Sequence, residues 1–245
     1  MKKYVLGLTL FVGLWWILSA IVGSEIILPS PMAVLGSLKQ LVISEVFYKS
    51  LFSTLLKGFL ATFFVIAIGV PVGMFIGLSE TISQILRPFV SILQSVPVIS
   101  WLALAIFMWG IGWKGPVLLT TLSLLPVVII NTASGVLSVD KELVEMSKVY
   151  DVPKAKVFKV VYMGSLLPFM IASLQITLGN VWKTILVTEF LCGDEGLGVM
   201  IAWARSYVDT PQIFAITLIA VTFSLTLERF SHMLFGKVLR RWRLS

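Results

Sequence analysis

Charged side chains are scarce in this chain of 245 residues, of which 13% are charged, and they form only one long block, 140–168. Within it, Leu143, Met146 and Tyr150 recur at i, i+3 and i+7, which is the spacing of one helix face. Apolar runs long enough to cross a membrane flank the block on both sides. A polar helical segment between two spans needs a surface to pack against, so the block predicts a noncovalent site for a soluble partner. Its charged members are Asp140, Lys141, Glu142, Glu145, Lys148, Asp151, Lys154, Lys156 and Lys159.

A second helical face follows within the same block, and it has the same spacing as the first. Its members are Ala155, Phe158 and Tyr162. Between the two faces, Asp151 followed by Pro153 is typical of a helix cap and a first helical turn. The block therefore predicts two short helices joined at residues 150–152.

Side chains for enzymatic or metal chemistry are few. Cys192 is the single cysteine and His232 the single histidine, so we expect neither a disulfide nor a zinc or haem site. The sequence contains no G-x-x-x-x-G-K-[ST] loop, no H-E-x-x-H and no nucleophile elbow. We therefore expect a chain that is not an enzyme, binds no cofactor itself and cannot hydrolyse ATP.

The composition defines the elements that must position the charged block. Hydrophobic residues make up 58% of the chain, which leaves too little polar surface for a water-exposed globule. The predicted fold class is an all-α polytopic membrane protein, with residues 1–245 forming one transmembrane domain. Six spans are expected, at about 4–22, 51–78, 88–109, 116–133, 166–191 and 212–234, with the charged loop at 136–165.

Several boundaries follow from prolines and from segment length. The first apolar stretch is longer than a signal-peptide core and more spans follow, so we interpret it as a retained helix. Pro31 is at the preferred first position of an amphipathic helix that we expect to lie in the membrane interface. Pro97 falls inside the third predicted span, where it should bend the helix for packing or for function. The stretch 192–211 is expected to be an outer loop.

The basic residues indicate the orientation. If both termini are cytoplasmic, most lysines and arginines of the chain, including those of the charged block, lie on the inner side. The outer side then holds only Lys39, Lys49, Lys57, Lys114 and Arg205. The net charge of +7 thus reflects topology and contact with anionic lipid, and nucleic-acid binding is not expected.

One lysine is predicted to lie at membrane depth. A charge at mid-bilayer costs about 2.5–3.5 kcal/mol on insertion scales, so Lys183 should face protein or water. One hypothesis is that Lys183, with Asn180 one turn earlier and Trp182 nearby, attracts an anionic solute in a pathway that Pro97 helps to shape. The alternative is that Lys183 snorkels or neutralises a carboxylate for stability.

The outer end of the fifth span holds a carboxylate and leads into an aromatic loop. Glu189 is about 240° around the helix from Lys183, so the two are not partners within one helix. We assign Glu189 to structure or to an outer gate. Trp203, Tyr207 and Asp209 are candidates for contact with an external protein, and ordinary loop packing is the alternative.

The charged block resembles the EAA loop of ABC-transporter permeases: a Glu, two small residues, a glycine, then an apolar run ending in Leu-Pro. The flanking segments are similar to the nitrate, sulfonate and taurine importer branch. The matching residues are Glu145, Met146, Ser147, Asp151 and Leu167-Pro168 in the loop, and Leu28 to Pro31, Trp109 to Gly112, Val139-Asp140, Thr188-Glu189 and Gly196 to Gly198 in the flanks.

This resemblance implies a type I importer fold in the bacterial inner membrane. The implied partners are a second permease copy, two cytoplasmic ATPase subunits that hold ATP and Mg, and an external solute-binding protein. Glu145 would be the docking carboxylate for the ATPase, with Leu143, Met146 and Tyr150 as the apolar face.

The loop departs from the family pattern at three positions. Met146 and Ser147 replace alanines, and Asp151 replaces a glycine. Asp is one of the few residues that tolerate a left-handed turn, so we expect the turn to be kept.

The solute stays open at this point. The branch carries nitrate, taurine, sulfonates and bicarbonate, whereas relatives carry pyrimidine or vitamin precursors, and Lys183 favours a small anion. A rival function is a secondary transporter or channel without an ATPase. That rival would predict carboxylates at mid-span and an inverted repeat, whereas the carboxylates of this chain cluster in loops.

Overall fold

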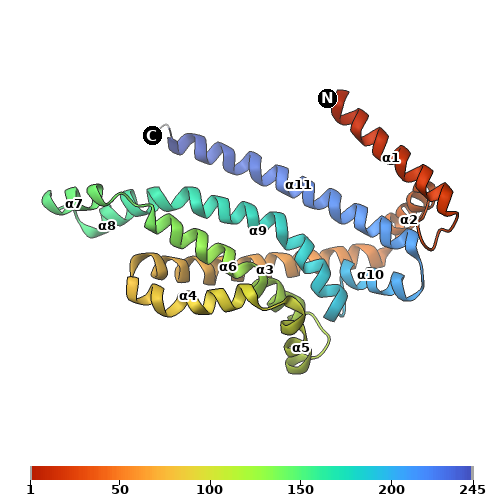
Figure 1. Ribbon diagram of the computed structural model, residues 1–245, viewed down its shortest axis with the longest axis horizontal. Helices are drawn as coiled ribbons and strands as arrows, with labels where there is room; N and C mark the ends of the chain where they lie inside the picture. Colours follow the sequence, from red (N-terminus) through yellow and green to blue (C-terminus); the bar gives the residue numbers. More distant parts are fainter. Residues whose placement is uncertain (1, 244–245) are drawn as a thin grey trace.

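Helix α6 (Lys114–Leu137) is the centre of the fold in the computed structural model, which describes residues 2–243. It packs along its length against α3 (Glu45–Leu78) and α9 (Met163–Cys192), and these helices run together along the long axis (Figure 1). Most side chains of α6 are buried within the chain. Side chains at 2–5, 8, 232, 234 and 236–243, and thus His232 and the terminal basic residues, lie outside the described set.

All elements in residues 2–243 are helical, which confirms the predicted all-α class. Besides the three central helices, the chain forms a broken pair, a projecting hairpin and helices at both ends. These are α1 (Lys2–Val22), α2 (Pro31–Ile43), α4 (Glu80–Ser95), α5 (Val98–Trp109), α7 (Lys141–Val149), α8 (Lys154–Val157), the π-helical segment η1 (Phe158–Tyr162), α10 (Leu197–Ser206) and α11 (Thr210–Arg243).

The close packing of α3 on α6 depends on three glycines four residues apart. Gly69, Gly73 and Gly77 place the α3 backbone directly on α6. A Cβ on Gly69 would lie 2.9 Å from Val128, and one on Gly73 would lie 2.7 Å from Thr132. Small residues at this spacing are a common means of close helix contact in membranes.

The third predicted span is not one straight helix. The ordered helix begins at Glu80, eight residues earlier than expected, because Ser79 caps it by accepting a hydrogen bond from the Ile82 amide at 3.4 Å. The chain then turns by 92° between α4 and α5. Pro97 is the N-cap residue of α5, so it lies between two helices, where we had expected it to kink one.

The second helix of the charged block also differs from expectation. α8, η1 and α9 form one continuous helical segment, so the second helix is the start of the fifth span. Asp151 does not cap it: the N-cap residue is Pro153, which provides no side-chain hydrogen bond. The predicted first position of Pro31 in α2 is confirmed, with Ser30 as the cap at 3.2 Å from the Ala33 amide.

The two ends of the bundle carry different elements. α7 and α8 project at one end, α2 and α10 lie at the other, and α1 leans away from the bundle (Figure 1). The expected outer loop 192–211 therefore contains a helix, α10.

Four helical segments of the described chain are long and apolar enough to span a membrane: α3, α6, the α8–α9 segment and α11 up to Ser231. The bent α4–α5 pair makes a fifth if it counts as one span. α1 is helical over the range of the first predicted span, but its described apolar part is only Thr9–Val22. The count of six spans stays a prediction.

Candidate functional site

The projecting hairpin is built by two local signals. Asp140 caps α7, accepting a hydrogen bond from the Glu142 amide at 2.8 Å. After α7, Asp151 adopts φ of +48°, which confirms the left-handed turn expected where the family has glycine. The amide of Val152 then donates to the Ser147 carbonyl at 2.9 Å and closes the turn. The turn sends the chain back so that α7 faces the start of the α8–α9 segment.

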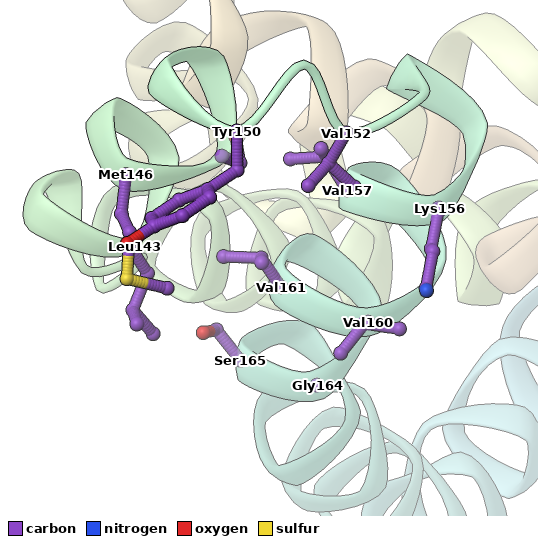
Figure 2. A pocket seen from close by; sticks show the side chains of 11 residues that line it. Leu143, Met146, Tyr150, Val152, Lys156, Val157, Val160, Val161, Gly164 and Ser165 are labelled. Carbon is purple, nitrogen blue, oxygen red and sulfur yellow. The ribbon is translucent and has the colours of Figure 1, made fainter.

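An open apolar groove of about 460 Å³ lies between the two arms of the hairpin. Leu143, Met146 and Tyr150 line one wall, so the predicted apolar face of α7 is gathered on one surface, and Val160 and Val161 line the other wall (Figure 2). Tyr150 is 74% exposed and Met146 52%. Exposed apolar surface of this kind, rimmed by polar residues, is typical of a protein interaction site.

The other predicted coupling residues take different positions around the groove. Ser147 is buried, and its hydroxyl donates to the Val144 carbonyl at 2.7 Å. Glu145 is exposed and does not line the groove. Phe158 and Tyr162 stack on each other with ring centroids 6.1 Å apart, and neither lines the groove. The groove thus uses the first predicted helix face but not the second.

Lys183 lies on an exposed stripe that follows α9. The stripe has helical spacing and comprises Ala172, Ile176, Asn180, Lys183, Val187 and Leu191. The Asn180 amide donates back to the Ile176 carbonyl at 2.9 Å. Lys183 and Asn180 therefore share a face, as the sequence predicted, and this face is not covered by the rest of the chain.

Trp182 and Pro97 are not next to Lys183 on this stripe. Trp182 is 6% exposed and packs edge-to-face on Phe223 of α11, with centroids 4.4 Å apart, so its side chain does not lie on the exposed stripe with Lys183. Pro97 is exposed at the α4–α5 break, next to a pocket between α4, α5 and α6 that includes Gln94 and Ser123.

A second set of polar residues is buried at the opposite end, where α3, α9 and α10 meet. Glu189, 1% exposed, accepts hydrogen bonds from the Thr54 hydroxyl at 2.8 Å and from the Gly198 amide at 3.1 Å. Lys57 forms an ion pair with Glu189 at 3.2 Å and donates to the Glu195 carbonyl. Because the Glu189 carboxylate is buried, it cannot itself contact an external protein.

Lys57 is the residue of this buried set that the sequence analysis did not single out, since it was counted only as an outer-side charge. The signal was present: Lys57 is the single charged residue in the apolar run 51–78. An ionisable group at membrane depth is expected to pair, and Glu189 was the acid in a neighbouring span.

Of the three loop residues proposed to contact an external protein, two have exposed side chains and the third caps a helix. Trp203 is 53% exposed and Tyr207 83%, on and just after α10. Asp209 instead accepts a hydrogen bond from the Gln212 amide at 3.0 Å, so its carboxylate caps the start of α11.

This arrangement of helices is similar to that of membrane subunits in two solved ABC transporters. It matches the inward-facing methionine ABC transporter MetNI with a TM-score of 0.66, over 82% of this chain and 99% of the other at 17% identity. It matches the bacterial alginate ABC transporter, solved with an alginate-bound periplasmic protein, with a TM-score of 0.68 over 97% of each chain at 15% identity. At such identities the likeness shows the fold alone.

The sequence identifies the family. Residues 69–243 match the model described as "Binding-protein-dependent transport system inner membrane component", and the chain belongs to this family. It is similar to the taurine transport system permease protein TauC of Escherichia coli, 29% identical over 87% of this chain and 80% of the relative.

Two further relatives support the same branch. The putative aliphatic sulfonates transport permease protein SsuC of Bacillus subtilis is 28% identical over 96% of this chain and 85% of its own length. The nitrate import permease protein NrtB of Synechococcus elongatus is 24% identical over 81% and 74%. The predicted ABC importer permease of the nitrate, sulfonate and taurine branch is therefore confirmed.

Proposed function

We propose that this chain forms the translocation pathway for a small anion such as a sulfonate, taurine or nitrate. An external binding protein delivers the solute, and partner ATPase subunits that bind ATP and Mg drive transport. The chain itself catalyses no reaction. The observation that carries this proposal is the open groove at the α7 hairpin, since its exposed apolar wall at the end of a membrane bundle needs a soluble occupant.

The ATPase is the occupant that the hairpin suits. Leu143, Met146 and Tyr150 supply an apolar contact of helical spacing, and Glu145 adds a carboxylate on the same helix. An amphipathic helix laid into a partner's groove is a recurrent mode of recognition. Nucleotide-driven closure of the ATPases would then shift the permease between inward-open and outward-open states.

The pathway requires a second copy of the permease, and the exposed stripe on α9 is where we place it. Lys183 and Asn180 are polar groups on an otherwise apolar stripe. Two copies related by a two-fold axis would bring two lysines towards one passage, which would attract an anion. Pro97 at the α4–α5 break lies beside a polar pocket that we assign to the same passage.

The other end of the bundle is assigned to the binding protein. Trp203 and Tyr207 are exposed aromatic side chains near α10, and aromatic residues are enriched in protein interfaces. This assignment puts α10 on the outer side and α7 on the cytoplasmic side of the bacterial inner membrane, with both termini cytoplasmic, in agreement with the distribution of basic residues.

Crosslinking and transport in vesicles test the proposal. With Met146→Cys, we expect a crosslink to the ATPase, whereas Val149→Cys, exposed on α7 but outside the groove, should give a weaker one. Glu145→Ala should lower ATP-dependent uptake by roughly 10-fold if its carboxylate docks in the partner. Uptake that continues without any ATPase would support a secondary transporter and overturn the proposal.

The cargo has one alternative with a supporting observation. The riboflavin transport system permease protein RibX of Chloroflexus aurantiacus is 29% identical over 67% of this chain. Uptake of labelled taurine, nitrate, an alkanesulfonate and riboflavin, each measured separately, distinguishes the two cargo classes. Uptake of riboflavin alone would favour a vitamin and remove the anion.

A further inference from the structure

The buried pair of Lys57 and Glu189 contacts three elements at once: α3, α9 and the start of α10. We propose that these two are positioning residues that anchor α10 to the end of the bundle and so hold its outer surface in place. The outer surface is the one carrying Trp203. Its use as a docking surface rests on the proposed function, whereas the anchoring does not.

The first amides of α10 take their acceptors from other helices. Gly196 is the N-cap residue of α10 and offers no side chain. The Leu197 amide donates to the Thr54 hydroxyl of α3 at 2.8 Å, and the Gly198 amide donates to the Glu189 carboxylate of α9 at 3.1 Å. A helix start needs acceptors for its free amides and favours a negative charge. Thr54 and Glu189, which are distant in sequence, thus cap the start of α10 as a neighbouring side chain does in other helices.

Two glycines make room for the carboxylate. Gly196 has φ of +125°, and a Cβ there would collide with the Glu189 carboxylate. A Cβ on Gly198 would be 2.6 Å from the Glu189 Cβ. The start of α10 is therefore shaped around this one acid, which indicates that the contact is specific and not the incidental burial of a charge.

Lys57 ties down the segment that leads into α10. Its Nζ pairs with Glu189 and also donates to the carbonyl of Glu195, and it lies 4.0 Å from Asp194. The segment 193–196 is thus bound at both of its ends, by α9 through the chain and by α3 through Lys57. Loss of either charge would leave the other buried without its partner.

The inner and outer faces of α10 explain why its position matters. Leu197, Met200 and Ala204 are buried, and the first two join a core cluster that includes Val34 and Ile216. Trp203, one turn after Met200, is exposed. A shift of the α10 start would move this exposed face relative to the bundle.

Thiol accessibility of α10 tests the anchor directly. Cys192 is the only native cysteine, so Cys192→Ser provides a background without thiols. Val199→Cys in that background reports a buried side chain near the start of α10, and Ser83→Cys reports a buried site in α4, which packs on α3 and α6. The full-length chain is purified with its ATPase partner and labelled with a maleimide.

The test variants are Lys57→Met and Glu189→Gln, with Thr54→Val as a milder one that keeps both charges. We expect the labelling rate at Val199→Cys to rise by about 10-fold or more in the first two, because loss of a buried partner populates the locally open form. Thr54→Val should give a smaller rise. Glu45→Gln, which breaks the exposed Glu45–Lys49 pair on the same helix, is the matched control and should change nothing.

Two outcomes would overturn the anchor. Unchanged labelling at Val199→Cys in all three variants would mean that the pair does not hold α10. An equal rise at Ser83→Cys would mean general unfolding and no local role. A separate readout is ATP hydrolysis stimulated by the binding protein: if α10 opens but stimulation is normal, the anchor stands and the proposed docking surface falls.

Discussion

At the α10 end of the bundle, the Glu189 carboxylate is fully buried and bonded to groups from α3 and α10. At the α7 end, by contrast, Met146 and Tyr150 are exposed around an open groove. A buried charge destabilises the fold unless it is paired within the chain. Exposed apolar side chains are unfavourable in water, and a partner that covers them removes this cost. The comparison indicates that one end is completed within the chain and the other is completed by a partner.

The largest difference in stability is expected between removal of the buried Glu189 carboxylate at one end and removal of the exposed Glu145 carboxylate at the other. Glu189→Ala should lower the free energy of unfolding by about 3–5 kcal/mol, since it leaves Lys57 buried without its partner. Glu145→Ala should change it by no more than about 0.5 kcal/mol, because this side chain is exposed. Thermal unfolding of both variants measures the difference, and equal shifts would refute the contrast between the ends.

The second effect concerns the apolar wall of the groove. Tyr150→Ala should weaken binding of the ATPase by about 1–3 kcal/mol if Tyr150 is an anchor of the interface, with little change in the stability of the permease. Val149→Ala is the control, exposed on the same helix but outside the groove. Co-purification of the ATPase at graded salt and detergent compares them. Equal retention in both variants would show that the groove is not the interface.

A third, smaller effect sharpens the role of the α9 stripe. Lys183→Ala should lower uptake of an anionic solute by about 10-fold, which corresponds to about 1.4 kcal/mol, and Lys183→Arg should retain most of it. Lys114→Ala, another exposed lysine that lies at the start of α6, serves as the control. Normal uptake by Lys183→Ala at normal expression would remove Lys183 from the pathway.

The smallest effect is expected at the hairpin turn. Asp151→Gly should be tolerated, because glycine adopts positive φ readily. Asp151→Val should lower stability by about 1–2 kcal/mol, since a β-branched residue is strained at φ of +48°. Limited proteolysis of the hairpin measures the change. Faster cleavage in Asp151→Gly than in Asp151→Val would contradict this account of the turn.

The helices and the hairpin could be predicted because their signals are local. Ser30 and Pro31 start α2 as expected, and the spacing of Leu143, Met146 and Tyr150 defines the groove wall. These patterns depend only on neighbours within two helical turns.

The buried pair could not be read in this way, because its members are 132 positions apart and joined only by the packing of α3 on α9. The 92° turn at Pro97 was also beyond local rules, since a proline predicts an interruption of the helix but not the angle between its two parts. α10 was hidden by glycines that are typical of a loop, although Leu197, Met200 and Ala204 have helical spacing.

The continuous segment from Lys154 to Cys192 joins the two ends of the molecule mechanically. Its 39 residues make a rod of about 58 Å at a rise of 1.5 Å per residue. The π-helical turn at Phe158–Tyr162 lies near one tip of this segment, and Pro168 follows inside α9. Because the helical segment is continuous, a tilt imposed at the end beside the groove would also move the end that holds Glu189.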